Sequence, residues 1–219
     1  MKLGVKHFEC LYKELERANL AKILKSIPYF PRMINEDQNE DLFNPVTKEE
    51  FLSILQSFKK DQSLGLDGWS VEFYLYYFDL FGDDSLRVLE EVCREGKTTN
   101  CFNSTFIALI PKQDCLMYFD GFRPISLCNY LYKIITKVIT TRLKPIISGY
   151  ISAEWFEFLH GRQIHKTIGT TQGVLQFLNI YQTPAILLKI NLSKAYEKVS
   201  WLYLRLLLIH MCFSLLVIN

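Results

Sequence analysis

The chain has 219 residues, of which 49% are hydrophobic and 22% are charged, and its formal net charge is +2. This composition is typical of a globular protein with many aromatic residues, and it excludes a chain that is disordered throughout. The length allows one good hydrophobic core or two small ones.

Charge is distributed unevenly along the chain. Residues 61–121 contain 4 Lys or Arg and 11 Asp or Glu, whereas residues 122–219 contain 11 and 3. A basic C-terminal half suits a polyanion such as nucleic acid, because neutralisation of phosphates supplies most non-specific affinity. Solvated helix faces would give the same pattern, so charge alone leaves both interpretations open.

The six cysteines include no Cys-x-x-Cys pair, and no secretory signal precedes them. We therefore expect reduced thiols in an intracellular protein, either nuclear or cytoplasmic. His160 and His165 stand five residues apart and would not share a helix face, which argues against a zinc site.

Residues 1–60 predict helices joined by short breaks. Thr47 stands three residues before Glu50, which is the spacing of a capping box at the start of a helix. The apolar residues of that helix recur with helical spacing and are expected to face a core: Phe51, Ile54, Leu55 and Phe58.

A glycine-rich turn follows, with Gly65 and Gly68 on either side of Asp67. The aromatic run after this turn is too dense for a solvated face, so it predicts a core helix. Gly96 stands where a later helix would end.

Between residues 103 and 128 the periodicity changes from that of a helix to that of a strand. The sequence "NSTFIALIPK" alternates, and "FRPISL" resumes an extended run after a turn. This pattern predicts a β-hairpin that brings Lys112 and Arg123 near one another. Two long cations on a hairpin suit triphosphate oxygens, and ordinary surface charge is the alternative.

The segment after Asn129 predicts an amphipathic helix, "YLYKIITKVITTRLKPII". Its apolar residues are expected to face inward and Lys133, Lys137 and Lys144 to face outward, with Lys137 one turn after Lys133 and Lys144 two turns after Lys137. The three lysines form either a surface that follows a nucleic-acid backbone or the solvated side of the helix.

Near the C-terminus, an apolar run leads to Asn191 and predicts a strand over about residues 185–191. Residues 201–219 are almost wholly apolar, but Arg205 and His210 lie among them and argue against a membrane helix. We expect instead a helix that has lost its packing partners and exposes an apolar patch.

The chain resembles the reverse transcriptases of LINE-type non-LTR retrotransposons, especially those of plant genomes, from about Ile27 to its C-terminus. Its matching segments occur in the order seen in that family: "GLDGWSVEFY", "FNSTFIALIPK", "FRPISLCNYLYKIITKVITTRLKPII", "GRQI" and "LLKINLSKAYEKVSW".

The resemblance implies an α+β fold of the right-hand polymerase type, with mainly helical fingers, a β-hairpin and the start of the palm in an incomplete antiparallel sheet. We expect a helical segment over 1–60 that leads into the fingers, fingers over 61–184 and a partial palm over 185–219.

The family's nucleotide site maps onto particular positions of this chain. The hairpin cations that hold the incoming nucleoside triphosphate map to Lys112 and Arg123. The aspartate that binds the catalytic metals maps to Asn191, and the neighbouring backbone carbonyl to Leu192.

Other positions follow from the same resemblance. Ser193 and Lys194 would line the triphosphate path, and Tyr196 would exclude a 2′-OH. A template–primer of RNA or DNA is the implied partner, and the basic residues expected to contact it are Lys133, Lys137, Lys144 and Arg162.

Asn191 conflicts with polymerase chemistry. That chemistry needs two divalent ions, Mg²⁺ in this family, held by anionic carboxylate oxygens. An asparagine offers one neutral carbonyl and cannot bridge two metals. The family's second aspartate pair, in a Y-x-D-D-like loop, does not follow Asn191, and the adjacent pair Asp83-Asp84 lies far upstream. We expect a truncated, degenerate copy without an intact metal site, a bound cofactor or polymerase activity.

Two other functions stay open. The chain would act as a non-catalytic nucleic-acid-binding module if it keeps the basic surface of the fingers, and its binding would then depend on salt. A helical protein-interaction domain would instead bind its partner independently of salt.

Overall fold

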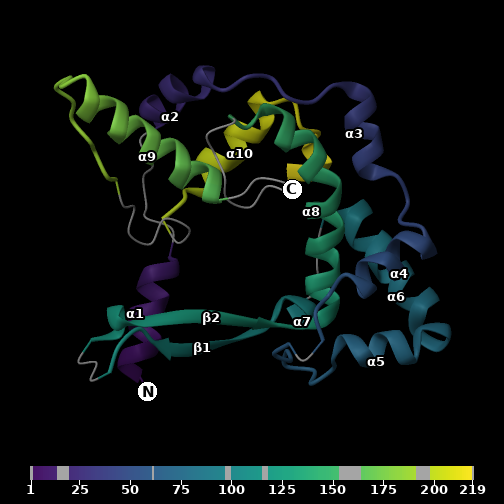
Figure 1. Cartoon of the computed structure of the whole chain (residues 1–219). Coiled ribbons are helices and arrows are strands. Elements are labelled where there is room, and N and C mark those ends of the chain that lie inside the picture. The colour runs from purple at the N-terminus through teal and green to yellow at the C-terminus, as the bar shows by residue number, and fades with distance from the viewer. Residues whose placement is uncertain are drawn as a thin grey trace.

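The computed structural model describes residues 2–13, 20–60, 62–96, 100–114, 118–152, 164–190 and 198–218. The helices are α1 (Lys2–Tyr12), α2 (Leu20–Ser26), α3 (Glu36–Phe43), α4 (Lys48–Gln56), α5 (Val71–Tyr76), α6 (Phe78–Glu95), α7 (Asn100–Asn103), α8 (Tyr130–Tyr150), α9 (Ile164–Ile180), α10 (Trp201–His210) and α11 (Leu215–Ile218), with short 3₁₀ turns η1 (Ile27–Tyr29) and η2 (Phe119–Gly121). Figure 1 shows mostly helices and one β-hairpin, which extends along the lower edge of the picture between α1 and α7.

The predicted α+β class is confirmed, with many helices and a small antiparallel sheet. Among the described residues, the sheet consists of β1 (Thr105–Pro111) and β2 (Phe122–Cys128). Thr105 pairs with Cys128 at one end, and Pro111 pairs with Phe122 at the other. The hairpin predicted between 103 and 128 is therefore present.

The main core lies between α4, α5, α6 and α8. The apolar residues predicted on the second helix enter it, because Phe51, Ile54 and Leu55 are buried and Phe58 packs at its edge. The inner face of α8 supplies the facing side chains: Tyr130, Leu131, Ile134, Ile135 and Val138.

Side-chain caps fix where the core helices begin. The Thr47 hydroxyl accepts a hydrogen bond from the Glu50 amide, as the spacing predicted. At the start of α5, the Ser70 hydroxyl accepts a hydrogen bond from the Phe73 amide. Gly96 ends α6 with a left-handed conformation (φ 65°), which glycine adopts without the steric cost that a Cβ brings.

The C-terminal segment packs against the N-terminal third. The Met211 carbonyl accepts hydrogen bonds from the Met33 and Ile34 amides, and a second small core joins Ile34, Met211 and Phe213. The expectation of a helix without packing partners was wrong in this respect, although Trp201 remains 69% exposed. None of the described helices is long and apolar enough to cross a membrane.

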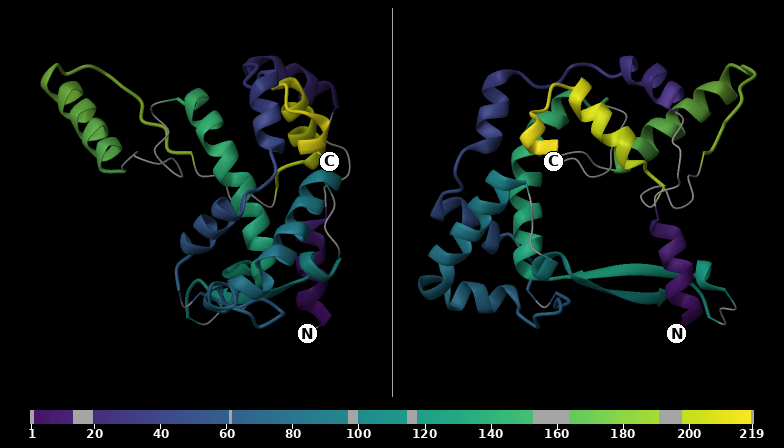
Figure 2. Two further views of the ribbon diagram at one scale, coloured as in Figure 1. Left: turned by 90° about the vertical axis from the view of Figure 1, so that its right-hand side faces the viewer. Right: turned by 180° about the vertical axis from the view of Figure 1, so that it is seen from behind.

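The strand predicted over 185–191 is not formed in its described part. Residues 183–190 have no regular secondary structure, and Ile186 is 97% exposed. A strand needs a neighbour for its backbone hydrogen bonds, and the strands of the described sheet, β1 and β2, pair with each other. Helix α9, just before this segment, stands apart from the other helices in the left view of Figure 2.

Candidate nucleotide and nucleic-acid interface

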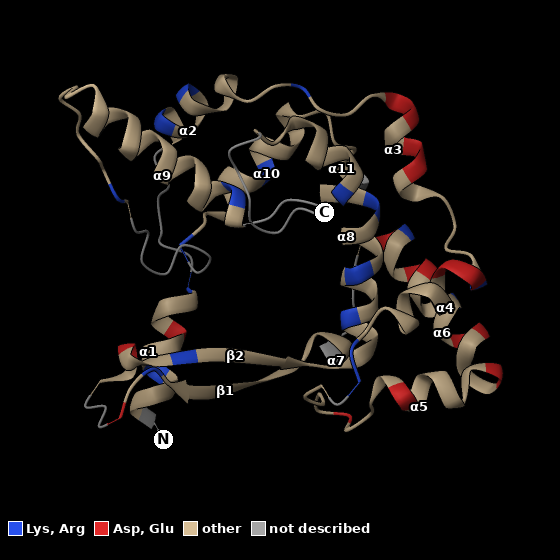
Figure 3. Ribbon diagram, viewed as in Figure 1, with Lys and Arg blue, Asp and Glu red and all other residues tan. Residues whose placement is uncertain are grey.

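The loop end of the hairpin carries both predicted phosphate ligands. Arg123 lies opposite Ile110 in the register, and Lys112 follows two residues after Ile110. Because side chains alternate along a strand, this spacing favours the same side of the ribbon for Lys112 and Arg123, as diagonal neighbours. Both residues are exposed, and Figure 3 shows basic residues where the hairpin meets α1.

The loop fixes the start of the Lys112 side chain. The Lys112 amide donates to the Gly121 carbonyl at 2.9 Å, and its ammonium donates to the Asp120 carbonyl at 3.0 Å. An ammonium has three donors, so this contact leaves two of them for an incoming anion.

Lys133 and Lys137 of α8 are half-buried and contact neighbouring residues, which the sequence did not predict. Lys133 donates to the Ser63 carbonyl at 2.8 Å, and its ammonium lies 4.5 Å from the centre of the Tyr130 ring. The Lys137 ammonium lies 5.5 Å from the centre of the Phe58 ring. In these cation–π contacts the ammonium lies near an aromatic ring, and the aliphatic stem of the lysine packs along apolar surface.

Lys144 lies on the same side of α8, two turns beyond Lys137. In Figure 3 the basic residues of α8 form a row along the helix, while acidic residues gather on α3, α4, α5 and α6. The basic helix and these acidic elements meet at Arg142, which pairs with Glu50 of α4.

The other predicted site residues lie outside the residues that the structure describes. These are Arg162, Asn191, Leu192, Ser193, Lys194 and Tyr196. Within the described part of the chain, no group of three His, Cys, Asp or Glu is placed to hold a metal ion.

The donor set at the metal position can be judged from its chemistry. A divalent ion of the polymerase type takes anionic oxygens, and Asn191 offers a neutral amide. An amide at Asn191 therefore does not supply the anionic oxygen that such an ion takes, and no chemical step is assigned to an ion there.

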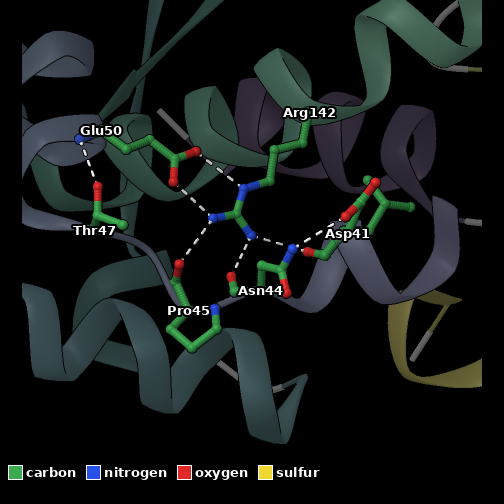
Figure 4. A network of polar contacts seen from close by, with 7 residues as sticks. Asp41, Asn44, Pro45, Thr47, Glu50 and Arg142 are labelled. Atoms are coloured by element: carbon green, nitrogen blue, oxygen red, sulfur yellow. Dashed lines mark hydrogen bonds and ion pairs between the residues drawn. The ribbon is translucent and has the colours of Figure 1, made fainter. Parts of the chain in front are cut away.

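Sequence reasoning missed a polar network centred on Arg142 (Figure 4). The guanidinium donates to both carboxylate oxygens of Glu50, at 3.0 and 2.7 Å. It also donates to the carbonyls of Leu42, Asn44 and Pro45.

The Arg142 and Glu50 side chains are 15% and 28% exposed. The hydrogen bonds to the Glu50 carboxylate raise the already high pKa of Arg142. The network ties α8 to the segment between α3 and α4. A signal existed in the sequence, because Arg142 follows the buried Val138 by one helical turn, where an apolar residue would be expected.

A cavity of about 290 Å³ lies beside this network and is lined mainly by apolar side chains of α6 and α8. The Cys93 thiol is in its wall, and burial raises the pKa of that thiol. A raised pKa favours the protonated thiol, which is a weaker nucleophile than the thiolate.

A second missed residue is Asn129, which is buried and precedes α8. Its side-chain oxygen accepts a hydrogen bond from the Asp67 amide at 3.3 Å. A Cβ on Gly65 would lie 2.5 Å from the Asn129 Cα, so only glycine fits there. The predicted glycine turn is thereby locked to the start of α8.

Comparison with known proteins places the site in context. Residues 110–205 match the family model described as "Reverse transcriptase (RNA-dependent DNA polymerase)". The matched stretch contains Lys112, Arg123, the whole of α8 and Asn191.

The chain is also 29% identical, over 172 residues, to the "Transposon TX1 uncharacterized 149 kDa protein" of Xenopus laevis. That alignment covers 78% of this chain and 13% of the Xenopus protein. The chain is therefore similar to reverse transcriptases over residues 110–205, where most of its predicted site residues lie, and to a transposon protein over 172 residues.

Proposed function

We propose that this chain is a fingers and partial palm region of a reverse transcriptase from a LINE-type non-LTR retrotransposon of the kind found in plant genomes. In this proposal it binds nucleotide phosphates at the hairpin but does not catalyse synthesis. The observation that carries the proposal is the pair of exposed cations, Lys112 and Arg123, on the hairpin inside the stretch that resembles reverse transcriptases.

The geometry of the hairpin supports phosphate binding. The Arg123 guanidinium can grip two phosphate oxygens with its planar fork, and the Lys112 ammonium adds a point charge beside it. The loop contacts of Lys112 restrict the side chain before a ligand arrives, which lowers the entropy that binding must remove.

The absence of synthesis is supported by Asn191. Two-metal catalysis needs a carboxylate that bridges both ions, and an amide supplies neither the charge nor the second oxygen. Removal of a direct metal ligand should cost more than the roughly 10- to 100-fold that removal of a supporting group costs.

The test is extension of a labelled primer on an RNA template by the purified chain and by Asn191→Asp, with Mg²⁺ or Mn²⁺. We expect both proteins to remain at the level of a no-protein control. The variant gains one carboxylate, but these 219 residues hold no aspartate after position 191. An active reverse transcriptase serves as the positive control, and product from the natural chain would overturn the proposal of inactivity.

A second candidate function is nucleic-acid binding by the basic side of α8. The observation that favours it is the helical spacing of Lys133, Lys137 and Lys144, which places them on one side of α8. Affinity should fall as salt rises, with a slope near −0.9 per neutralised duplex phosphate or about −0.7 for a single strand.

Labelled RNA and DNA strands titrated at several salt concentrations would test this binding. A replacement of Lys137 and Lys144 by alanine should make the slope shallower by about 1 for each phosphate that the variant no longer neutralises. A salt-independent interaction, or no interaction at low salt, would contradict it.

A further inference from the structure

The N-terminal helix α1 packs against the loop of the hairpin. The Phe119 ring centroid lies 5.5 Å from that of His7 and 6.4 Å from that of Phe8. Gly4 lies close enough that a Cβ there would be 3.2 Å from the Phe119 ring. Figure 1 shows α1 crossing the hairpin at its loop end.

The loop that α1 contacts is the one that holds Lys112. Phe119, Asp120 and Gly121 form the short turn η2. The carbonyls of Asp120 and Gly121 accept hydrogen bonds from the ammonium and the amide of Lys112. The His7 Nε2 atom also lies 3.7 Å from an Asp120 carboxylate oxygen. A continuous set of contacts thus joins α1 to the Lys112 side chain.

The hairpin needs such support. A two-stranded hairpin is marginally stable by itself in water, and the sheet in the described part of the chain has two strands. The side chains of β1 are mostly exposed, with Phe106 at 59% and Ile110 at 49%. Packing from outside the sheet must therefore order its loop end, and the aromatic rings of α1 are in place to provide it.

We propose that α1 is a positioning element for the phosphate site, and that Phe119 transmits its packing to Lys112. This inference rests on the proposed phosphate binding by the hairpin. Phe119 touches no phosphate in this scheme. It holds η2 against α1, and η2 in turn holds the Lys112 side chain in the orientation that an anion meets.

The direct test of this positioning is hydrogen exchange at the Lys112 amide, measured on the whole chain. Phe119→Ala should speed exchange of that amide on the order of 10-fold, because it removes both ring contacts. Phe106→Ala removes an exposed ring from the same hairpin, beyond the contacts with α1, and should leave the Lys112 amide unchanged. Equal exchange in the natural chain and in Phe119→Ala would overturn the inference.

A second variant changes the α1 side of the contact with Phe119. Gly4→Val places side-chain atoms against the Phe119 ring, and valine favours a helix more than glycine does, so α1 itself should persist. This variant should also speed exchange at Lys112. Phe119→Tyr keeps the ring and should retain natural exchange. Natural exchange in Gly4→Val would count against α1 as the positioning element.

A triphosphate titration tests whether Phe119 affects phosphate binding through Lys112. With a labelled deoxynucleoside triphosphate as the probe, Phe119→Ala should raise the Kd about 3- to 10-fold, as expected when a preorganised contact is loosened. In a Lys112→Ala background the same change should have no further effect, because Phe119 acts through Lys112. An equal effect in both backgrounds would overturn the positioning role.

The natural chain is the reference for this titration. If it binds no triphosphate, the proposed phosphate function fails, and the role of α1 in that function fails with it. Faster exchange in Phe119→Ala would then still identify α1 as the element that orders the hairpin loop. The two failures are therefore distinguishable.

Discussion

Arg142 shows how one residue can join segments that are distant in sequence. Its guanidinium is held by the Glu50 carboxylate, 92 positions away, and by backbone carbonyls near Asn44. The planar fork of an arginine pairs with both oxygens of a carboxylate and still reaches backbone carbonyls, a geometry that a lysine ammonium lacks. The network therefore fixes α8 relative to the start of α4.

Replacement of Arg142 by alanine should lower the free energy of unfolding by about 3 kcal/mol, because it leaves the Glu50 carboxylate and three carbonyls without their donor. Arg142→Lys should lose part of this, since the charge remains but the fork does not. Denaturant unfolding measures both values. A decrease smaller than about 0.5 kcal/mol for Arg142→Ala would show that the network contributes little.

Tyr74 gives the chain a pH dependence at the alkaline end. Burial raises the pKa of its phenol to about 12 from an ordinary value of 10.0. A raised pKa in the folded state means that the contribution to stability is complete below about pH 10 and is lost as pH rises toward about 12.

We therefore expect the unfolding free energy to fall between about pH 10 and 12, and to fall less in Tyr74→Phe, which has no phenol to ionise. Denaturant unfolding at a series of pH values makes this comparison. Lysines titrate in the same range, so the difference between the two proteins is the quantity to examine. Parallel curves would contradict the assignment to Tyr74.

At the scale of elements, close approach of the backbone at Gly65 fixes the glycine turn to the start of α8. Gly65→Ala should cost about 1 to 3 kcal/mol, because the new Cβ meets the backbone of Asn129, which cannot move aside. Gly169 in α9 has no neighbour within 4 Å of its Cβ position, so it offers a matched control.

Gly169→Ala should gain up to about 1 kcal/mol in the stability of that helix, from alanine's higher helix propensity. Thermal unfolding with circular dichroism reports both variants. A Gly65→Ala protein as stable as the natural chain would mean that the turn and α8 are not locked together.

The elements were predictable where their signals are local. The alternation of residues 103–128 and the cap at Thr47 depend on neighbours within a few positions, and both were found. The strand expected over 185–191 failed in its described part because an apolar run supplies no hydrogen-bonding partner. Strand formation depends on a neighbouring strand, which the local pattern does not specify.

At the scale of the whole molecule, the C-terminal segment joins the N-terminal third through Asn39. Its side-chain amide donates to the Cys212 carbonyl at 2.8 Å, and its oxygen accepts from the Ser214 amide at 2.9 Å. These hydrogen bonds span 173 and 175 positions, so no local pattern could have predicted them. The same holds for the partners of Arg142 and Asn129.

Asn39→Ala should cost about 1 to 2 kcal/mol, because it removes these two hydrogen bonds. It should also speed proteolysis between residues 211 and 218, because the segment loses its attachment. Asn179→Ala removes an amide from the exposed side of α9 and serves as the control. Equal cleavage rates in Asn39→Ala and the control would contradict this role for Asn39.

The hairpin positions of the candidate site residues could be predicted from the sequence, but the contacts of these residues with other segments could not. The positions of Lys112 and Arg123 follow from hairpin periodicity, whereas the packing of α1 on Phe119 depends on an approach of segments that are far apart in the sequence. Likewise, the lysines of α8 were identified, but their contacts with Ser63 and Phe58 were not.

The central claim is that the hairpin cations bind nucleotide phosphates, and a triphosphate titration tests it most directly. A labelled deoxynucleoside triphosphate is titrated at low salt against the natural chain, the double variant Lys112→Ala with Arg123→Ala, and Lys166→Ala as a control that removes an exposed charge from α9. Each charge-assisted hydrogen bond contributes about 1.5 to 3 kcal/mol, so the double variant should bind at least about 10-fold more weakly. The control should match the natural chain. Equal affinity in all three proteins, or no binding by the natural chain, would contradict the account.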